Sequence, residues 1–353
     1  MAFGIELKRG EWQEIENNPK ISGGLTAVKE QLQRLTDQLK LASVKTKALE
    51  SCFKRAEELA QKLNLILDDR SGKWIRWFET HRKTFTLSLT PLDIAAEFHG
   101  FMQQHQAAWI FTSANLSIAN KFDYFAGNLG LSHATSESWG SPFDYPNQSL
   151  FYHPKGLPQP NDPNFVPMIV DFALPVLLAS KGRAFFLFTS HRALKEAAEL
   201  LEKKIKYPLL IQGSRPKALL LEQFKEAGNA VLLGTSSFWE GVDVRGEALS
   251  CVIIDKLPFA SPGDPVLKAR LEAMTQQGKN PFFEYQLPTA VIALRQGIGR
   301  LIRDVTDRGV LMVCDPRLLK RSYGQLFLDS VPPMKRTRDI ADVQAFFQQE
   351  TGQ

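Results

Sequence analysis

The apolar stretch AFFLFT at Ala184–Thr189 decides the fold, together with the amphipathic segment that follows it at His191–Lys204. A short apolar run without polar alternation is typical of a strand that is buried on both faces of a sheet. The amphipathic segment predicts a helix that packs one face against that sheet. The stretch therefore predicts one strand–helix unit of an α/β fold.

Similar units lie on both sides of this stretch. Further apolar strands are predicted at 209–212, 230–234 (AVLLG), 250–255 (SCVIID) and 310–314 (VLMVC), and helices at 168–180, 216–227 and 265–277. Strands that alternate with helices form a parallel sheet with helices on both faces. The region 168–353 is therefore predicted to be a domain of this class.

Ligands of such sheets bind at the carboxyl ends of the strands, and polar residues follow several of the predicted strands there. They are Thr189 and Ser190, the run Gln212-Gly213-Ser214, residues 235–243 and Asp315. The sequence therefore predicts a ligand-binding edge at this end of the sheet.

An arginine-containing segment precedes the last predicted strand. Residues 288–298 (PTAVIALRQGI) are predicted to form a helix that leads into QGIGRLIR at 296–303. Arg300 and Arg303 are three residues apart and Gln296 lies four before Arg300, a spacing that places all three on one helical face. Gly297 and Gly299 leave room there for a ligand or another backbone.

Two guanidinium groups aimed at one point would bind phosphate, because the planar fork matches its oxygens and keeps its charge. The alternative interpretation is a solvated basic helix end, paired with Asp304 and Asp307.

The first third of the chain has a different pattern. Residues 1–24 are polar and end in a glycine pair that we interpret as a flexible boundary. From Leu25 to Leu67 apolar residues recur at alternating spacings of three and four, with Thr46 as the one polar exception. This heptad pattern predicts either one long coiled-coil helix or two helices folded back on each other.

The region between the heptads and the α/β pattern is mixed. Residues 73–90 are predicted to form two strands, 91–104 a short helix and 107–112 (AAWIFT) an apolar strand. Residues 132–167 are rich in Ser, Pro and Asn and are predicted to form an irregular connector.

Composition restricts the class of protein. Hydrophobic residues make up 44% of the 353, and no apolar run is long enough to span a membrane. The net charge of +5 is compatible with nucleic-acid binding. The three cysteines are far apart and the N-terminus has no signal-like apolar stretch, so we expect a cytoplasmic protein without a local metal site.

Five short motifs occur in a characteristic order: TSANLS at 112–117, FTS at 188–190, GTSSFWEGVD at 234–243, DKLPF at 255–259 and QGIGRLIR at 296–303. This ordered set resembles the superfamily 2 ATP-dependent DNA helicases of the DinG/YoaA group, which are relatives of XPD. The resemblance covers about residues 73–340 well and the heptad region loosely. It implies a RecA-like α/β helicase C-terminal domain at 168–353, preceded by a helical arch-like segment at 1–72, return strands of the first motor domain at 73–131 and a connector at 132–167.

The resemblance also implies residue roles. Thr112, Ser113 and Ala114 resemble the segment that couples nucleotide state to strand movement, although Asn115 replaces the usual threonine. Nucleic-acid contacts are implied for Thr189, Ser190, Thr235, Ser236 and Glu240, and ATP contacts for Gly241, Asp243, Gln296 and Gly299. Arg300 and Arg303 resemble the catalytic arginine fingers that stabilise a transferring phosphoryl group.

Several family features do not occur in the 353 residues. There is no G-x-x-x-x-G-K-[ST] loop, no DEAH-like segment, and none of the four cysteines that hold an iron–sulfur cluster in DinG and XPD. We therefore expect the C-terminal part of a 5′–3′ DNA-repair helicase, inactive alone. The complete enzyme would use ATP and Mg²⁺, bind single-stranded DNA, and require the missing N-terminal half. A replication-polymerase accessory protein is a further possible partner.

Two alternatives stay open from the sequence. One is a non-catalytic nucleic-acid-binding or partner-docking module that keeps the RecA-like fold, which the missing phosphate loop would favour. The other is an RNA helicase, because the general motifs do not separate DNA from RNA.

Overall fold

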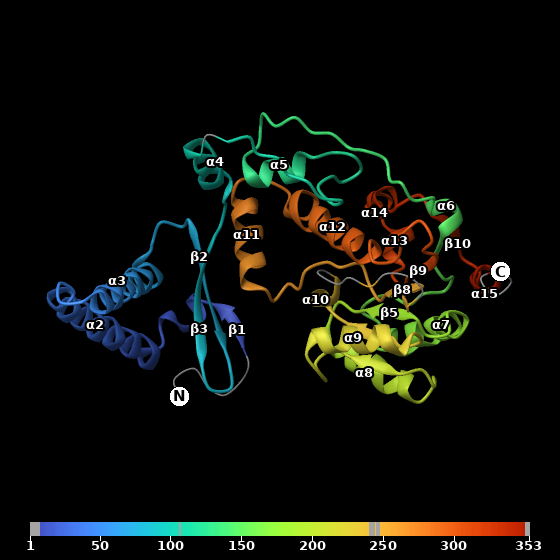
Figure 1. Ribbon diagram of the computed structural model, residues 1–353, viewed down its shortest axis with the longest axis horizontal. Coiled ribbons are helices and arrows are strands. Elements are labelled where there is room, and N and C mark those ends of the chain that lie inside the picture. Colours follow the sequence, from blue (N-terminus) through green and yellow to red (C-terminus); the bar gives the residue numbers. More distant parts are fainter. Residues whose placement is uncertain (1–7, 106, 240–243, 245–247, 350–353) are drawn as a thin grey trace. The chain divides into compact units, whose positions relative to one another are not determined.

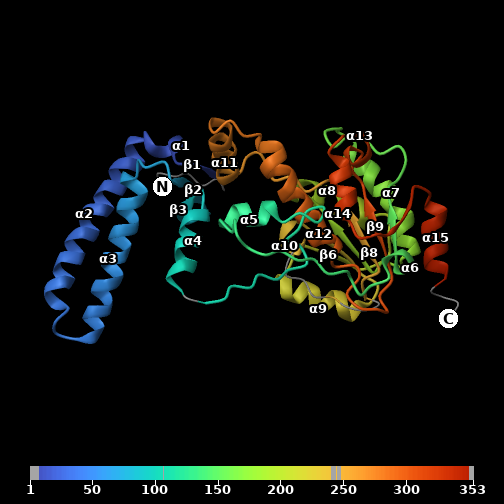
Figure 2. The same ribbon diagram turned by 90° about the horizontal axis from the view of Figure 1, so that it is seen from above.

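The computed structural model describes residues 8–105, 107–239, 244 and 248–349. The chain divides into two compact units (Figures 1 and 2). The first unit consists of Met1–Ala107, Asn128–Leu131 and Ala260–Pro281, and the second consists of Ala108–Gly127, Ser132–Phe259 and Phe282–Gln353.

The second unit is built on a parallel sheet (Figure 1). Its described strands are β4 (Ser149–Tyr152), β5 (Ala184–Leu187), β6 (Leu209–Ile211), β7 (Val231–Gly234), β8 (Cys251–Ile254), β9 (Gly309–Val313) and β10 (Lys335–Thr337). Their order is β10-β4-β9-β8-β5-β7-β6, and every pairing between neighbours is parallel. Strands β4, β5, β7, β8 and β9 are buried along their whole length, which explains why the sequences of β5, β7, β8 and β9 are continuously apolar.

Helices cover both faces of this sheet. Along β5, Phe185 and Leu187 join one apolar core, while Ala184 and Phe186 join the other. The first core includes side chains of α9 (Lys217–Ala227), α10 (Ser236–Trp239), α12 (Leu287–Ile298), α13 (Arg317–Lys320) and α14 (Gly324–Ser330). The second includes side chains of α7 (Phe165–Ala179), α8 (His191–Glu202) and α15 (Ile340–Gln348). The shorter elements are α5 (Asp123–Leu129), α6 (Tyr145–Gln148) and the π-helix η2 (Phe282–Gln286).

The first unit combines a small antiparallel sheet with helices. The sheet contains β1 (Arg9–Glu11), β2 (Trp74–Thr80) and β3 (Phe85–Pro91) in the order β1-β2-β3. The helices are α1 (Gln13–Glu16), α2 (Pro19–Ala42), α3 (Lys47–Asp68), α4 (Ala95–Gln104) and α11 (Pro265–Gln276). Ion pairs join α11 and its N-cap to β1, from Lys268 to Glu11 and from Arg9 to Asp264.

The heptad region forms two helices folded back on each other, α2 and α3, which lie side by side in both views (Figures 1 and 2). The break falls at Thr46, whose hydroxyl caps α3 by accepting a hydrogen bond from the Leu49 amide at 3.2 Å. The flexible boundary expected at Ser22–Gly24 is wrong. These residues lie inside α2, which starts at Pro19 with Asn18 as its N-cap.

Two other local predictions are wrong. Residues 107–112 form no strand, and Trp109 and Ile110 are 41% and 83% exposed, so the apolar run joins no core. Within 132–167, which we expected to be irregular, the four residues of β4 pair with β9 and β10, so β4 is the second strand from one end of the sheet. The strand reads SLFY, which begins with a polar residue and does not form a continuous apolar run like those of the predicted strands.

Candidate functional site

Polar residues follow five neighbouring strands at one edge of the parallel sheet. In spatial order they are Gln212 after β6, Thr235 after β7, Thr189 after β5, Asp255 after β8 and Asp315 after β9. The chain order of these residues differs from this spatial order, so only the topology places them in a row. The edge is where ligands of parallel α/β sheets bind.

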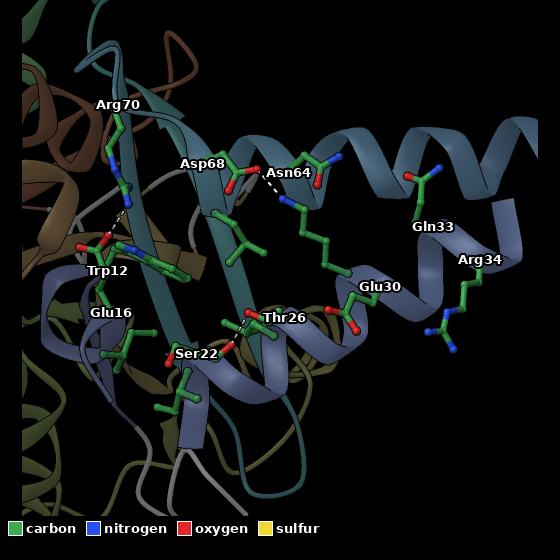
Figure 3. Close-up of a pocket in the computed structure, with 15 residues that line it drawn as sticks. Trp12, Glu16, Ser22, Thr26, Glu30, Gln33, Arg34, Asn64, Asp68 and Arg70 are labelled. Atoms are coloured by element: carbon green, nitrogen blue, oxygen red, sulfur yellow. Dashed lines mark hydrogen bonds and ion pairs between the residues drawn. The ribbon is translucent and has the colours of Figure 1, made fainter. Parts of the chain in front are cut away.

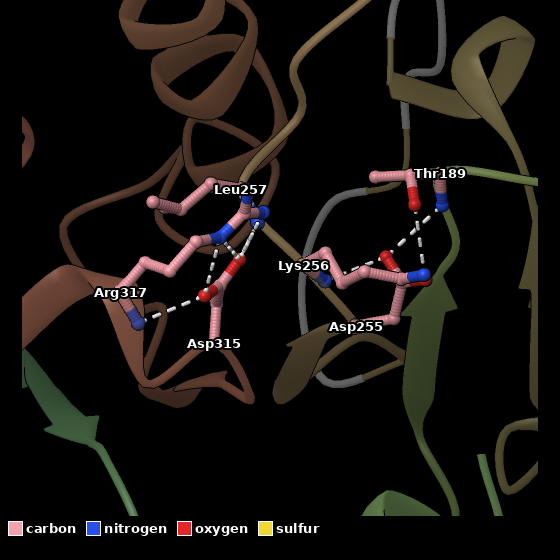
Figure 4. Close-up of polar contacts among 6 residues, drawn as sticks. All are labelled: Thr189, Asp255, Lys256, Leu257, Asp315 and Arg317. Carbon is pink, nitrogen blue, oxygen red and sulfur yellow. Dashed lines mark hydrogen bonds and ion pairs between the residues drawn. The ribbon is translucent and has the colours of Figure 1, made fainter. Parts of the chain in front are cut away.

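Asp255 is a fully buried polar group of this row and is 0% exposed. Its carboxylate accepts hydrogen bonds from the Thr189 amide at 3.0 Å, the Thr189 hydroxyl at 3.2 Å and the Lys256 amide at 2.6 Å (Figure 4). Burial raises the pKa of Asp255 to about 7, although the Lys256 charge and these hydrogen bonds act in the opposite direction. Asp255 therefore joins the ends of β5 and β8 and is not a surface group.

Asp315 is enclosed in the same way at the end of β9. It accepts a hydrogen bond from the Leu257 amide at 2.8 Å and binds the Arg317 guanidinium, with Nη2 at 2.6 Å from Oδ2 (Figure 4). On the other side of the row, the Gln212 side-chain oxygen accepts from the Thr235 amide at 2.6 Å and the Thr235 hydroxyl at 3.1 Å. These hydrogen bonds therefore link residues that follow neighbouring strands, and they fix the loops at this edge.

The residues predicted to contact nucleic acid have different surroundings. Thr189 and Ser236 are exposed, whereas Thr235 is buried. The Ser190 hydroxyl accepts a hydrogen bond from the Ala193 amide at 3.2 Å, so it caps α8. Glu240, Gly241 and Asp243, which we assigned to nucleic acid and ATP, lie outside the described residues.

Helix α12 ends at Ile298, so Arg300 and Arg303 do not lie on a helical face. The prediction from their three-residue spacing is therefore wrong in its geometry. The chain turns after Gly299, and the buried Asp307 carboxylate accepts hydrogen bonds from the amides of Arg303 at 2.7 Å and Asp304 at 2.9 Å. The second arginine thus projects from a loop whose backbone is fixed by Asp307.

Arg300 connects this loop to α10. Its Nε and Nη2 donate to the Trp239 carbonyl at 3.2 and 2.9 Å. A Cβ atom added to Gly297 would lie 3.0 Å from Trp239 Cε3, so Gly297 makes room for the Trp239 ring. Gln296 is half-buried and Gly299 is exposed.

Arg295 was not among the residues selected from the sequence. It links α12 to the segment at 112–117, which we predicted to couple nucleotide state to strand movement. Its guanidinium donates to the Ala114 carbonyl at 2.9 Å and to the Ser117 carbonyl. Thr112, Ser113 and Ala114 are exposed, and the Ser113 hydroxyl accepts from the Asn115 amide at 3.2 Å. An arginine within a largely apolar helical segment was the signal available in the sequence.

Cys251 and Cys314 are buried in the parallel sheet of the second unit, where burial raises their pKa values, and Cys52 is exposed on α3 of the first unit. Across the described part of the chain, no group of three or more His, Cys, Asp or Glu side chains is placed to bind a metal ion. No helix in that part has both the length and the apolar character needed to cross a membrane.

Comparison with known proteins gives consistent matches. Residues 174–334 match the helicase C-terminal domain family. Over 340 residues the chain is 44% identical to the ATP-dependent DNA helicase YoaA of Haemophilus influenzae, covering 96% of this chain and 53% of that protein. It is 45% identical over 341 residues to YoaA of Escherichia coli K12, covering 97% and 54%. The ATP-dependent helicase DinG of Mycobacterium tuberculosis is 35% identical over 288 residues, covering 79% and 43%.

The chain therefore spans about half the length of the curated relatives it matches. Two solved structures share its fold. The chain named XPD_APO has a TM-score of 0.59 at 16% identity, covering 84% of this chain and 60% of that one. The chain named XPD_Helicase has a TM-score of 0.53 at 17% identity, covering 85% and 55%. The predicted RecA-like α/β architecture with a preceding helical segment is confirmed.

Proposed function

Since this chain belongs to the DinG/YoaA family of XPD-like helicases, we propose that it supplies the second motor domain of an ATP-dependent DNA helicase. The relatives that carry this name are about twice as long as the chain, so the activity belongs to a larger protein than the 353 residues described. By resemblance to the family, the motor moves 5′ to 3′ on single-stranded DNA in repair or replication.

The junction at the end of α12 carries this proposal. Arg295 binds the carbonyls of Ala114 and Ser117, and Arg300 binds the carbonyl of Trp239. These contacts bring together three segments that resemble the coupling, strand-contacting and arginine-finger motifs. A nucleotide-driven motor needs such a junction, because a change at the phosphates must reach the DNA-contacting loops.

The arginine segment has the chemistry to stabilise a transferring phosphoryl group. We assign Arg303 as the principal finger, because Asp307 binds the Arg303 backbone and thereby fixes where the side chain starts. Arg300 uses part of its guanidinium fork to bind Trp239, which makes it both a finger and a positioning group. Arginine fingers contribute about 10³–10⁵-fold to turnover in related phosphoryl-transfer enzymes.

The exposed Thr189 and the N-terminus of α8 are suited to contact a DNA phosphate, because the first turn of a helix leaves backbone amides without partners inside the helix and favours an anion there. We assign the phosphate loop, the Mg²⁺ ligands and the catalytic base to the other motor domain, because the sequence of this chain contains no phosphate loop. ATP and Mg²⁺ would therefore act in the complete enzyme.

ATP hydrolysis tests this proposal, measured on this chain with and without single-stranded DNA. We expect no turnover in either case. We then expect DNA-stimulated turnover in a chimera that places the N-terminal half of the Escherichia coli relative before this chain.

In the chimera, Arg303→Ala should lower turnover by about 10³-fold while leaving DNA affinity unchanged. Lys320→Ala, which removes an exposed cation of α13 that makes none of the hydrogen bonds of the junction, is the matched control. A chimera that binds DNA without turnover would support a non-catalytic binding module, and normal turnover of Arg303→Ala would refute the finger assignment.

A further inference from the structure

Helices α2 and α3 form a hairpin that is anchored near the small sheet of the first unit. There Lys29 of α2 pairs with Asp68 of α3 at 2.5 Å, and Arg70 pairs with Glu16 of α1 at 3.1 Å (Figure 3). Helix α2 has 24 residues and is therefore about 36 Å long. Its last turn lies at the end of the hairpin remote from β1–β3 (Figure 2). We call residues 40–47, at this end, the apex.

The apex presents two apolar side chains to solvent. Leu41 is 80% exposed and Val44 is 88% exposed, whereas Leu39 and Leu49 of the heptad pattern are half-buried. Since Leu41 and Val44 lie outside the heptad positions, packing between α2 and α3 does not explain why they are apolar. Single exposed apolar residues are ordinary, but two of them at one turn indicate a contact surface.

Hydrogen bonds fix the backbone that carries these side chains. The Ser43 hydroxyl donates to the Lys40 carbonyl at 2.7 Å, and the Lys45 amide donates to the Ala42 carbonyl at 3.0 Å. The apex is therefore an ordered turn, and its two apolar side chains start from defined positions. A partner that binds there has little backbone entropy to overcome.

Three lysines accompany the apolar pair, and no acid lies between them. Lys40, Lys45 and Lys47 are exposed, and none of them makes an ion pair with another described residue. The nearest acids along the chain are Asp37 and Glu50, three residues before and after this stretch. Each of these acids accepts a hydrogen bond from a neighbour on its own helix. The apex therefore carries a local charge of +3, which attracts a polyanion.

Cations beside exposed aliphatic side chains fit the end of a DNA duplex. Lysines bind the phosphates of the strands, and aliphatic side chains can cover the flat face of a base pair, as apolar wedges do between base steps. A membrane surface fits less well, because binding in the lipid interface uses an apolar face along a whole helix, whereas the apolar pair here is confined to a turn.

We propose that the apex binds the junction between double-stranded and single-stranded DNA. Lys40, Lys45 and Lys47 contact phosphates near the junction, and Leu41 and Val44 pack against the last base pair of the duplex. This inference rests on the proposed function, which makes DNA the substrate. It adds a duplex contact in the first unit to the single-strand contacts that we assign to the second unit.

A forked DNA with 2-aminopurine in its last base pair tests the apolar contact, because the fluorescence of this base depends on its stacking. The whole chain should change the fluorescence saturably. Leu41→Ser/Val44→Ser should abolish this change and weaken fork binding about tenfold, as expected for the loss of one buried aliphatic side chain. Val28→Ser/Leu35→Ser, which replaces two exposed apolar residues of α2 outside the apex, is the matched control and should behave like the wild type.

The phosphate contacts are tested by the salt dependence of fork binding. Lys45→Ala/Lys47→Ala should reduce the slope of log affinity against log salt concentration by about 1.8, the contribution of two duplex phosphates. Lys62→Ala/Lys73→Ala removes two exposed lysines of the first unit outside the apex and should leave the slope unchanged. Affinity for oligo-dT should be the same for all these variants.

The outcomes separate this inference from the proposed function. Unchanged fork binding by both apex variants, with oligo-dT still bound, would overturn the inference alone. Loss of all DNA binding by the wild type would overturn both. Apex-dependent fork binding in a chimera that does not hydrolyse ATP would support the inference and contradict the proposed function. Binding to phosphatidylserine vesicles that requires Leu41 and Val44, without an effect of these residues on the fork, would overturn the inference in favour of a lipid surface.

Discussion

At the scale of single residues, Asp255 combines features that rarely occur together. It is fully buried, accepts three hydrogen bonds from Thr189 and Lys256, and has a pKa raised to about 7 by burial. Its environment therefore makes the stability of the sheet edge sensitive to pH.

Asp255→Asn should reveal this sensitivity. The folded pKa lies above the unfolded value of 3.8, so the folded state binds the proton more tightly and stability decreases as pH rises towards 7. Asparagine has a similar shape and does not titrate. Between pH 5 and 8 the free energy of unfolding of the wild type should fall by about 2–3 kcal/mol relative to the variant, measured by urea denaturation. Parallel profiles would contradict the raised pKa.

At the scale of elements, α12 organises the candidate site. Its last turn carries Arg295, which binds the segment at 114–117, and Gly297, which receives the Trp239 ring. The loop after it carries Arg300, which returns to the Trp239 carbonyl. The position of Trp239 therefore links the packing of α12 to the placement of an arginine.

Gly297→Val tests this link. A Cβ atom at Gly297 would already lie 3.0 Å from Trp239 and 3.6 Å from Leu187, both of which are buried. Overpacking there should lower the free energy of unfolding by about 2–3 kcal/mol, measured by urea denaturation. Gly127→Val in α5 is the control, because nothing lies within 4 Å of its Cβ position. Equal stabilities of the two variants would show that Trp239 adjusts freely.

At the scale of the whole molecule, the net charge of +5 acts on any nucleic acid that the chain binds. Neutralised phosphates release counterions, so affinity falls as salt concentration rises. Three contacts with phosphates of a single strand would weaken binding by about twentyfold between 50 and 200 mM salt.

Titration of this chain with fluorescent oligo-dT at several salt concentrations measures the slope of log affinity against log salt concentration. Arg303→Ala should leave this slope unchanged if Arg303 binds ATP. A slope reduced by the contribution of about one phosphate contact would instead show that Arg303 binds DNA. Binding without salt dependence would contradict the proposed phosphate contacts.

Local pattern predicted the elements well where they are long or continuously apolar. The strands around AFFLFT and the helices predicted at 191–204 and 216–227 are confirmed. Of the two alternatives for the heptad region, the structure shows two helices folded back on each other. The prediction failed for β4, whose sequence SLFY is not continuously apolar, and for 107–112, whose apolar residues join no core. The prediction that Arg300 and Arg303 share one helical face was wrong, because residues three apart in the sequence can lie beyond the end of a helix as well as within it.

The sequence by itself determined the class of fold and the family, because burial requires apolar strands and because the ordered motifs are specific. Tertiary structure alone decided which polar groups meet. Strand order places Thr189 on Asp255 across 66 positions of the chain, and α12 places Arg295 on Ala114 across 181. The physical reason is that hydrogen bonds between distant residues depend on how strands pair and helices pack, and local periodicity carries no record of either.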